Sequence, residues 1–289
     1  MTAVEDRTGA LTAPPVASVG RDGRAALRRR LVDGLGTSVA TLPAGEPVVV
    51  TLPLLRFART RPDSLAAPEE PFAWRPAFVR RSLGLAVVEA CAAGRFGSPL
   101  DAVGPVATLA IDQWQETGWR TFHWEPWLAG LAHGAQATVL ADAAGWATAL
   151  WSSLDWSGLD PRTRIGGADD QWVCPATHAV RLKGRSDVRV PLAPRGSGAS
   201  DAGNEEPVAL VSLSGGCPSP AWREELAYLA LVAALRSPSR PVPARVVGVW
   251  PDAGADRVVE VDEGALVDAA DLVVTTATAV VEARMSVPA

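Results

Sequence analysis

Residues 208–235 (VALVSLSGGCPSPAWREELAYLALVAAL) hold the pattern that decides the fold of this chain. Val208 to Leu213 is a short apolar run that ends at Gly215-Gly216, which predicts a buried strand. Ala221 to Leu235 then places apolar residues along one stripe at helical spacing, which predicts a helix. A strand that leads into a helix in this way is typical of α/β domains.

The sequence on both sides of this unit extends the pattern. Two predicted strands and a last predicted helix follow it: Arg245–Trp250, Val258–Val261 and Glu263–Arg284. Upstream, His178 to Lys183 and Asp187 to Val190 predict two strands that meet across a turn at Gly184. The order strand, strand, strand, helix, strand, strand, helix predicts a mixed sheet flanked by helices.

The first half of the chain has mostly helical periodicity. Its predicted helices are Arg21–Leu35, Ala77–Ala93, Leu100–Trp114, Pro126–His133 and Ala135–Leu154. Pro47 to Phe57 begins as a β-branched run and becomes helix-like after Pro53, and Pro194 to Glu206 is a polar loop. We therefore predict an α/β (α+β) fold in one integrated domain, with a disordered tail (1–20), a mostly helical region (21–160) and an α/β core (161–289).

Composition limits the possible functions. The net charge of −5 argues against strong autonomous nucleic-acid binding, which usually requires a basic surface. The 3 cysteines are widely separated, which favours a reducing compartment over a disulfide framework. The first residues lack the apolar segment of a leader, and no run approaches 18 uninterrupted apolar residues. We expect a cytoplasmic protein with no membrane span.

Four motifs lie in this framework. Gly84–Glu89 (GLAVVE) falls in a predicted helix, Gly184–Asp187 (GRSD) at the predicted turn, and Val211–Gly216 (VSLSGG) at a strand end. Glu224 and Tyr228 lie in the helix that follows. In order, spacing and context these motifs resemble the RecB-like branch of the PD-(D/E)XK nuclease superfamily, which includes nuclease domains of bacterial recombination helicases. The resemblance implies a restriction-endonuclease-like core.

The resemblance also implies a metal site with parts missing. In that family carboxylates hold Mg²⁺ or Mn²⁺ beside the scissile phosphate, and a lysine orients the attacking water. Asp187 matches the first metal carboxylate. Ser212 and Ser214 stand in place of the second carboxylate and the lysine, and Val88 in place of a helix histidine. Neutral hydroxyls cannot replace these groups, so the resemblance implies a degenerate site whose remnant is Asp187, Ser212, Ser214, Glu224 and Tyr228.

Two functions follow from this resemblance. The favoured one is a non-catalytic structural or recognition subunit of a DNA-processing or defence assembly, with a protein partner such as a helicase-like subunit, jointly supplied DNA contacts and no cofactor. The alternative is an active Mg²⁺- or Mn²⁺-dependent DNA nuclease, with the missing groups supplied by Glu205, Glu206 or Lys183, the single lysine of the chain. A third possibility is an unrelated α/β protein.

Two residue clusters are candidate surfaces. The chain has 11 tryptophans and 1 tyrosine, and Trp119, Trp124 and Trp127 lie close together. They are interpreted as core packing, as a partner surface or as a stacking platform for single-stranded nucleic acid. The basic cluster Arg28, Arg29 and Arg30 is interpreted as a solvated helix face or as a phosphate-binding patch.

Three smaller motifs are interpreted as structural. Cys174 and His178 have no second pair at zinc-ligand spacing. Gly166 to Asp170 (GGADD) holds paired carboxylates and predicts a turn in a loop. Gly215-Gly216 lacks the residues of a nucleotide-binding loop.

Overall fold

The structure is a computed structural model. It describes residues 11, 19–39, 47–62, 65, 72–120, 123–156, 158–160, 162–192, 207–236 and 242–286. The predicted polar loop at 194–206, with Glu205 and Glu206, lies outside these residues, as does most of the predicted tail.

A mixed sheet forms the centre of the described part of the chain. Its six strands are β1 (Val48–Thr51), β2 (Arg164–Val173), β3 (Val180–Pro191), β4 (Val208–Leu213), β5 (Arg245–Trp250) and β6 (Ala255–Glu260). Their order is β1-β3-β4-β5-β6, and β2 also pairs with β3. The β1–β3 and β4–β5 pairs are parallel, and the β2–β3, β3–β4 and β5–β6 pairs are antiparallel.

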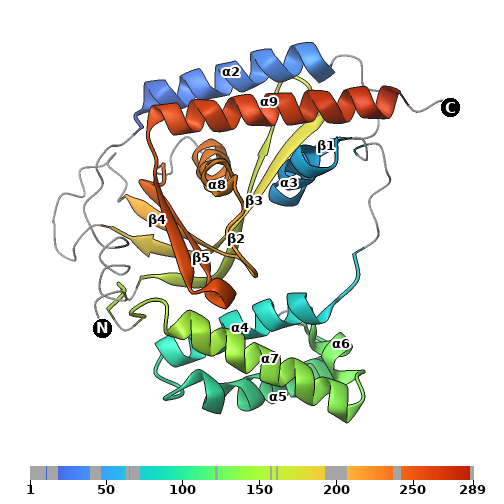
Figure 1. The fold of residues 1–289 in the computed structure, drawn as a ribbon, viewed down its shortest axis with the longest axis vertical. Helices are drawn as coiled ribbons and strands as arrows, with labels where there is room; N and C mark the ends of the chain where they lie inside the picture. Colours follow the sequence, from blue (N-terminus) through green and yellow to red (C-terminus); the bar gives the residue numbers. More distant parts are fainter. Residues whose placement is uncertain are drawn as a thin grey trace.

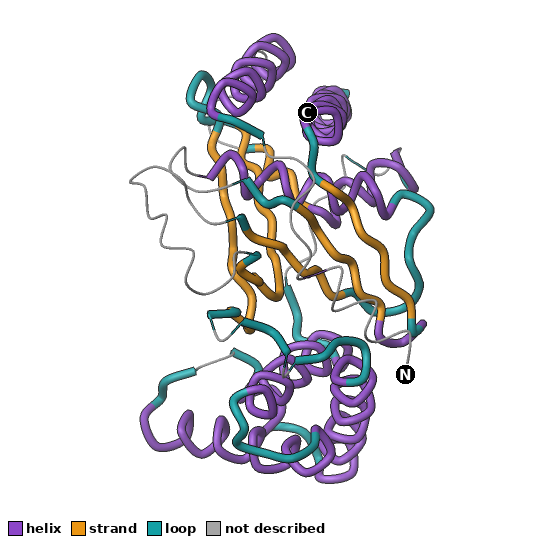
Figure 2. Tube along the Cα trace, turned by 90° about the vertical axis from the view of Figure 1, so that its left-hand side faces the viewer, coloured by secondary structure: helices purple, strands orange, loops and turns teal. Residues whose placement is uncertain are grey.

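Helices cover both faces of this sheet (Figures 1 and 2). One side holds α2 (Arg21–Val39), α3 (Leu52–Thr60), α8 (Trp222–Arg236) and α9 (Glu263–Met285). The other side holds α4 (Pro76–Ala92), α5 (Pro99–Thr117), α6 (Glu125–Ala129) and α7 (His133–Trp151). The predicted mixed α/β fold with flanking helices is confirmed.

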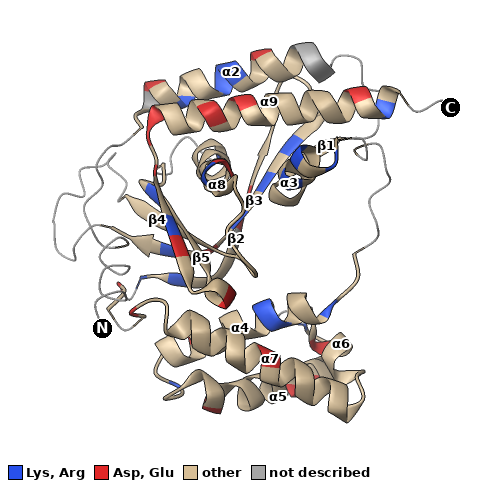
Figure 3. Ribbon diagram, viewed as in Figure 1, with Lys and Arg blue, Asp and Glu red and all other residues tan. Residues whose placement is uncertain are grey.

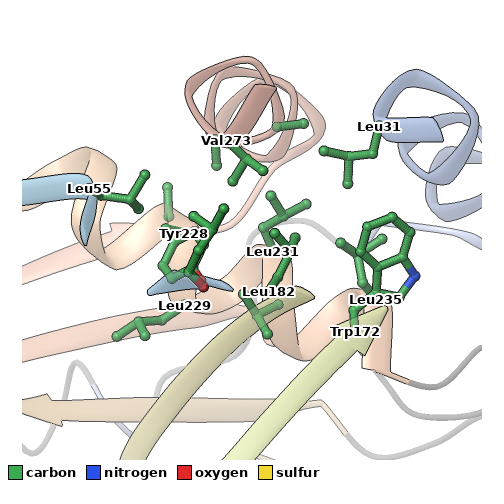
Figure 4. Packing of buried hydrophobic residues seen from close by; sticks show 14 of the residues in the cluster. Leu31, Leu55, Trp172, Leu182, Tyr228, Leu229, Leu231, Leu235 and Val273 are labelled. Atoms are coloured by element: carbon green, nitrogen blue, oxygen red, sulfur yellow. The ribbon is translucent and has the colours of Figure 1, made fainter. Parts of the chain in front are cut away.

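The first face is organised around α8. Every residue of α8 from Glu225 to Leu235 is buried, because the sheet lies on one side and α2 and α9 on the other (Figure 1). We call this cluster the α8 core. Figure 4 shows how its leucines, with Tyr228 and Trp172, meet between α2, α9 and the strands.

The second face packs on α4 and α7, and we call this cluster the α4 core. Val188, Val211 and Val247 from the sheet meet aliphatic and tryptophan side chains from the helices. Gly84 of α4 lets α7 approach closely, since a Cβ there would lie 2.5 Å from a ring carbon of Trp146. Figure 3 shows few charged residues on α4–α7.

Helix α9 is long and apolar enough to cross a membrane by length and composition, and no other helix in the described ranges is. In the structure it packs on α2 and α8. Residues such as Leu266, Val273 and Ala277 are fully buried there. Its apolar character is therefore explained by its place in the α8 core.

The switch from strand to helix after β1 was predicted from Pro53, and it is observed. The side chain of Thr51 accepts a hydrogen bond from the amide of Leu54 at 3.3 Å, which caps α3. Pro53 lies in the first turn, where its missing N–H costs nothing.

Two local predictions are wrong. No turn occurs at Gly184, because β3 runs without interruption from Val180 to Pro191, and the hairpin joins β2 to β3 instead. Gly184 has no side chain, but the strand continues through it. Its backbone faces Val232 of α8. The predicted loop at Gly166–Asp170 lies within β2.

Candidate functional site

Asp187 lies at a gap in the sheet. β1 pairs with β3 as far as Lys183, and β4 pairs with β3 from Val188 onward. The two strands flank the same edge of β3, so Asp187 lies between their carboxyl ends. On the opposite edge, β2 has a bulge between Ile165 and Ala168.

The carboxylate of Asp187 is fully buried and fully engaged. The backbone amide of Leu213 donates to Oδ2 at 2.7 Å. Nη2 of Arg81, from α4, donates to Oδ1 at 2.6 Å and to Oδ2 at 2.7 Å. Nε of Arg81 also donates to the carbonyl of Leu213 at 3.2 Å. One arginine therefore joins α4 to both β3 and β4.

Burial and pairing act on Asp187 in opposite directions. Loss of water raises the pKa of its carboxyl, whereas Arg81 and the amide of Leu213 lower it; burial is the larger effect. Arg81 is one-third exposed, so only the carboxylate is removed from solvent. A guanidinium in charge-assisted contact with both oxygens occupies the place that a metal cation would need.

The other remnant residues do not all converge on Asp187. Ser212 is buried and directly follows Val211, which pairs with Val188 of β3. Ser214 is partly exposed, and its amide donates to the carbonyl of Val249. Glu224 is half exposed, 4.0 Å from Arg59, on the solvent side of α8.

Tyr228 has a structural contact of its own. Its hydroxyl lies 2.7 Å from the carbonyl of Val50 and 2.9 Å from the carbonyl of Lys183, so it bridges β1 and β3 beneath α8. Burial raises the pKa of this phenol. The structure therefore brings the end of β4, which holds Ser212, to Asp187 through the amide of Leu213. Glu224 lies apart, and Tyr228 bridges the neighbouring strand pair.

The residue of α4 that contacts Asp187 is Arg81. Val88, placed at the family's histidine, is buried in the α4 core, whereas Arg81 contacts Asp187. The available signal was a pair of arginines within an apolar helix: Arg80 binds Asp252 at 3.0 Å, and Arg81 reaches inward. On α8, the motif named Glu224, whereas the buried glutamate of this helix is its neighbour Glu225.

Two further buried acids are held by arginines. Glu225 accepts from Arg56 at 2.7 Å and from the hydroxyl of Ser219 at 2.7 Å. Asp170, which is buried, contacts Arg189 and accepts from Arg236 at 2.6 Å. Asp170 thus belongs to an ion-pair network between β2, β3 and α8, in place of the turn predicted for it.

Two of the three arginines in the basic cluster on α2 contact neighbouring helices. Arg28 donates to the carbonyl of Leu235 at the end of α8. Arg30 forms a two-bond ion pair with Asp271 of α9, with both side chains half exposed. Arg29 is exposed. Through Arg28 and Arg30, the cluster therefore joins α2 to α8 and α9.

The tryptophan cluster does not form one surface. Trp119 is 67% exposed, Trp124 is fully buried in the α4 core, and Trp127 packs partly buried against it. The core interpretation suits Trp124, and Trp119 stands at the surface.

The residues Cys174 and His178 lie in the hairpin between β2 and β3. Cys174 is buried, and its carbonyl accepts from the amide of His178 at 2.9 Å. Within the ranges that the structure describes, no three His, Cys, Asp or Glu side chains are grouped as metal ligands.

Comparison with known proteins adds no assignment: no family model matches the chain, and no curated protein is similar to it in sequence.

Proposed function

We propose that this chain is a non-catalytic protein of the RecB-like PD-(D/E)XK nuclease type, which serves as a structural or recognition subunit of a DNA-processing or DNA-defence assembly. The observation that carries the proposal is the contact between Arg81 and Asp187. At the position that the resemblance gives to the first metal carboxylate, the protein supplies the positive charge itself. A divalent cation would have to displace a guanidinium bound to both oxygens.

The order of the elements supports the nuclease-like part of the proposal. In the family a helix precedes a strand hairpin, a further strand and a second helix. Here α4, the β2–β3 hairpin, β4 and α8 follow in that order, with Asp187 beside the end of β4. The hydroxyls of Ser212 and Ser214 neither bind a hard cation strongly nor orient a nucleophile as a lysine does.

Metal binding and cleavage test the non-catalytic part. We expect the purified chain to leave single- and double-stranded DNA intact with Mg²⁺ or Mn²⁺, and calorimetry to detect no metal binding that depends on Asp187. Cleavage that Asp187→Ala abolishes, and Asp252→Ala leaves unchanged, would establish the alternative, a working nuclease. A follow-up with Lys183→Ala would then test whether this exposed lysine of β3 has taken over the missing role.

The subunit role needs a separate experiment. A tagged full-length chain, purified from its native cells, is expected to elute in a stoichiometric complex with a helicase-like DNA-processing protein. Trp119 is the exposed member of the tryptophan cluster, and Trp119→Ala is expected to weaken that complex. Met285→Ala, at an exposed apolar residue at the end of α9, serves as the control. A chain that elutes alone would contradict the subunit role.

A further inference from the structure

A cavity lies on the α4 side of the sheet, apart from Asp187 and its partners. Its volume is about 650 Å³, which falls in the range of small-molecule sites, about 300–1,000 Å³. It is bounded by the carboxyl end of α4, by the chain that leads into β2, and by the β2 bulge with the facing part of β3. We call it the bulge cavity.

Several polar groups that line the bulge cavity have no hydrogen-bond partner in the described part of the chain. The side chain of Glu89, at the end of α4, is half-buried, and its carboxylate makes no hydrogen bond or ion pair with any described residue. Burial raises the pKa of this carboxyl, and the charge of Arg95 lowers it to a smaller extent. Ser186 is only 3% exposed, and its hydroxyl has no hydrogen-bond partner in the described part of the chain. The same is true of the Thr163 hydroxyl. Buried polar groups are normally paired, so these groups favour a ligand with polar atoms in this cavity.

The backbone keeps space open in front of Glu89. Gly166 and Gly167 both have positive φ, at 113° and 83°, so larger residues would be strained in the bulge. A Cβ on Gly166 would lie 3.8 Å from Oε2 of Glu89, in ordinary contact with it. A side chain at this position would therefore occupy space beside the carboxylate.

The remaining walls combine apolar side chains with charged ones. Trp156, Leu159 and Ile165 line the cavity. Trp156 is fixed by stacking on Trp151, with ring centroids 6.3 Å apart, and by donation from its indole nitrogen to the Leu150 carbonyl. Arg164, whose side chain is exposed, lies on the same lining. Two further charged residues of the lining are held in ion pairs: Asp160 with Arg162, and Arg189 with Asp170. The cavity therefore combines the carboxylate of Glu89, an apolar wall and the exposed guanidinium of Arg164.

These surfaces select a ligand class. An ionised carboxylate only accepts hydrogen bonds, so it requires donors. Guanine presents two adjacent N–H donors, N1–H and N2–H, which match the two carboxylate oxygens. Adenine and cytosine present one amine beside an acceptor, and uracil presents one N–H between two carbonyls. Apolar and aromatic walls suit the faces of a base, and an arginine suits a phosphate.

We propose that the bulge cavity binds a guanine nucleotide, with Glu89 accepting hydrogen bonds from the guanine edge and Arg164 facing the phosphate. The proposal is independent of the nuclease-like fold, since it uses none of the remnant residues. Ser186 and Thr163 are positioned to hydrogen-bond the sugar or the base once the cavity is filled.

Calorimetry on the full-length chain tests this with GMP, AMP, CMP and UMP. GMP is expected to bind at least about tenfold more tightly than the other three, the size of effect that one two-bond base contact gives. Glu89→Gln is expected to remove that preference and to weaken GMP binding by about tenfold or more. Arg164→Ala is expected to weaken GMP binding but to leave guanosine binding unchanged.

Two controls keep the test decisive. Glu224→Gln, a half-exposed glutamate outside the cavity, is expected to bind GMP like the unaltered chain. Glu89→Asp retains the charge and replaces Glu89→Gln if that variant fails to fold; it is expected to keep the base preference at lower affinity. No binding at millimolar GMP, equal binding of all four nucleotides, or GMP binding insensitive to Glu89 would each overturn the proposal.

Discussion

The two ends of α4 meet the sheet in opposite ways. Near its start, Arg81 engages both oxygens of Asp187, and the amide of Leu213 completes the contact. At its end, Glu89 faces a cavity, and its carboxylate has no hydrogen-bond partner among the described residues. In the motif that resembles a nuclease site, the carboxylate of Asp187 is thus bound by Arg81 of the same chain. Eight residues further along the helix, the carboxylate of Glu89 is free of such a contact with the described residues and can meet a ligand. The difference indicates that Asp187 serves the fold and that ligand chemistry is to be sought at Glu89.

The strongest test of this contrast is Arg81→Ala. The substitution leaves the carboxylate of Asp187 buried without its cation, and breaking one side of a buried pair costs about 3–5 kcal/mol. The free energy of unfolding, measured by urea denaturation, should fall by that amount. Arg80→Ala, the adjacent arginine with a partly exposed partner, should cost less than about 1 kcal/mol. Equal effects of the two substitutions would show that the Asp187 contact is not special.

Gly84→Ala tests how closely α4 must pack on α7 between the Asp187 contact and the bulge cavity. Gly84 lies between Arg81 and Glu89, and an added methyl group would overlap the ring of Trp146. Such overpacking costs about 1–3 kcal/mol. Gly145→Ala, on α7 with nothing within 4 Å of the added carbon, should instead gain up to about 1 kcal/mol from helix propensity. A stable Gly84→Ala variant would mean that α4 shifts freely against α7.

The sequence predicted the elements well where periodicity carried the information. Val208–Leu213 and Arg245–Trp250 were predicted with their observed bounds, because an apolar run between turn residues leaves few alternatives. Gly184 misled the prediction, since a glycine in a strand pattern equally suits a turn or a close approach to a helix. The space beside Val232 that requires this glycine depends on α8, which lies far away in the sequence.

The site could be predicted only in part, for a related reason. Asp187 was found because its local motif carried the signal. Arg81 was missed because its role depends on which face of α4 meets the gap between β1 and β4, a tertiary property that helical periodicity does not fix. Glu89 was noticed only as part of the Gly84–Glu89 motif. The bulge that opens the cavity in front of it depends on the pairing register of β2 with β3.

The pH dependence of stability gives a finer comparison. The pKa of Asp187 is raised by burial, so the folded protein binds this proton more tightly than the unfolded chain does. Stability from this group is therefore present below the unfolded pKa, about 3.9, and is lost as pH rises through the folded pKa. The loss amounts to about 1.4 kcal/mol for each pH unit that separates the folded from the unfolded pKa. Relative to Asp187→Asn, the unaltered chain should lose stability from about pH 4 upward. An opposite slope would mean that Arg81 outweighs burial.

The smallest expected effect completes the contrast. Glu89→Gln removes a charge that no described residue holds in an ion pair and that burial disfavours, so no protein hydrogen bond is lost. We expect the free energy of unfolding at neutral pH to change by less than about 0.5 kcal/mol, or to rise. Urea denaturation beside Arg81→Ala provides the direct comparison. A loss above about 1 kcal/mol would mean that Glu89 is as structural as Asp187, and the two ends of α4 would then no longer differ in the way described.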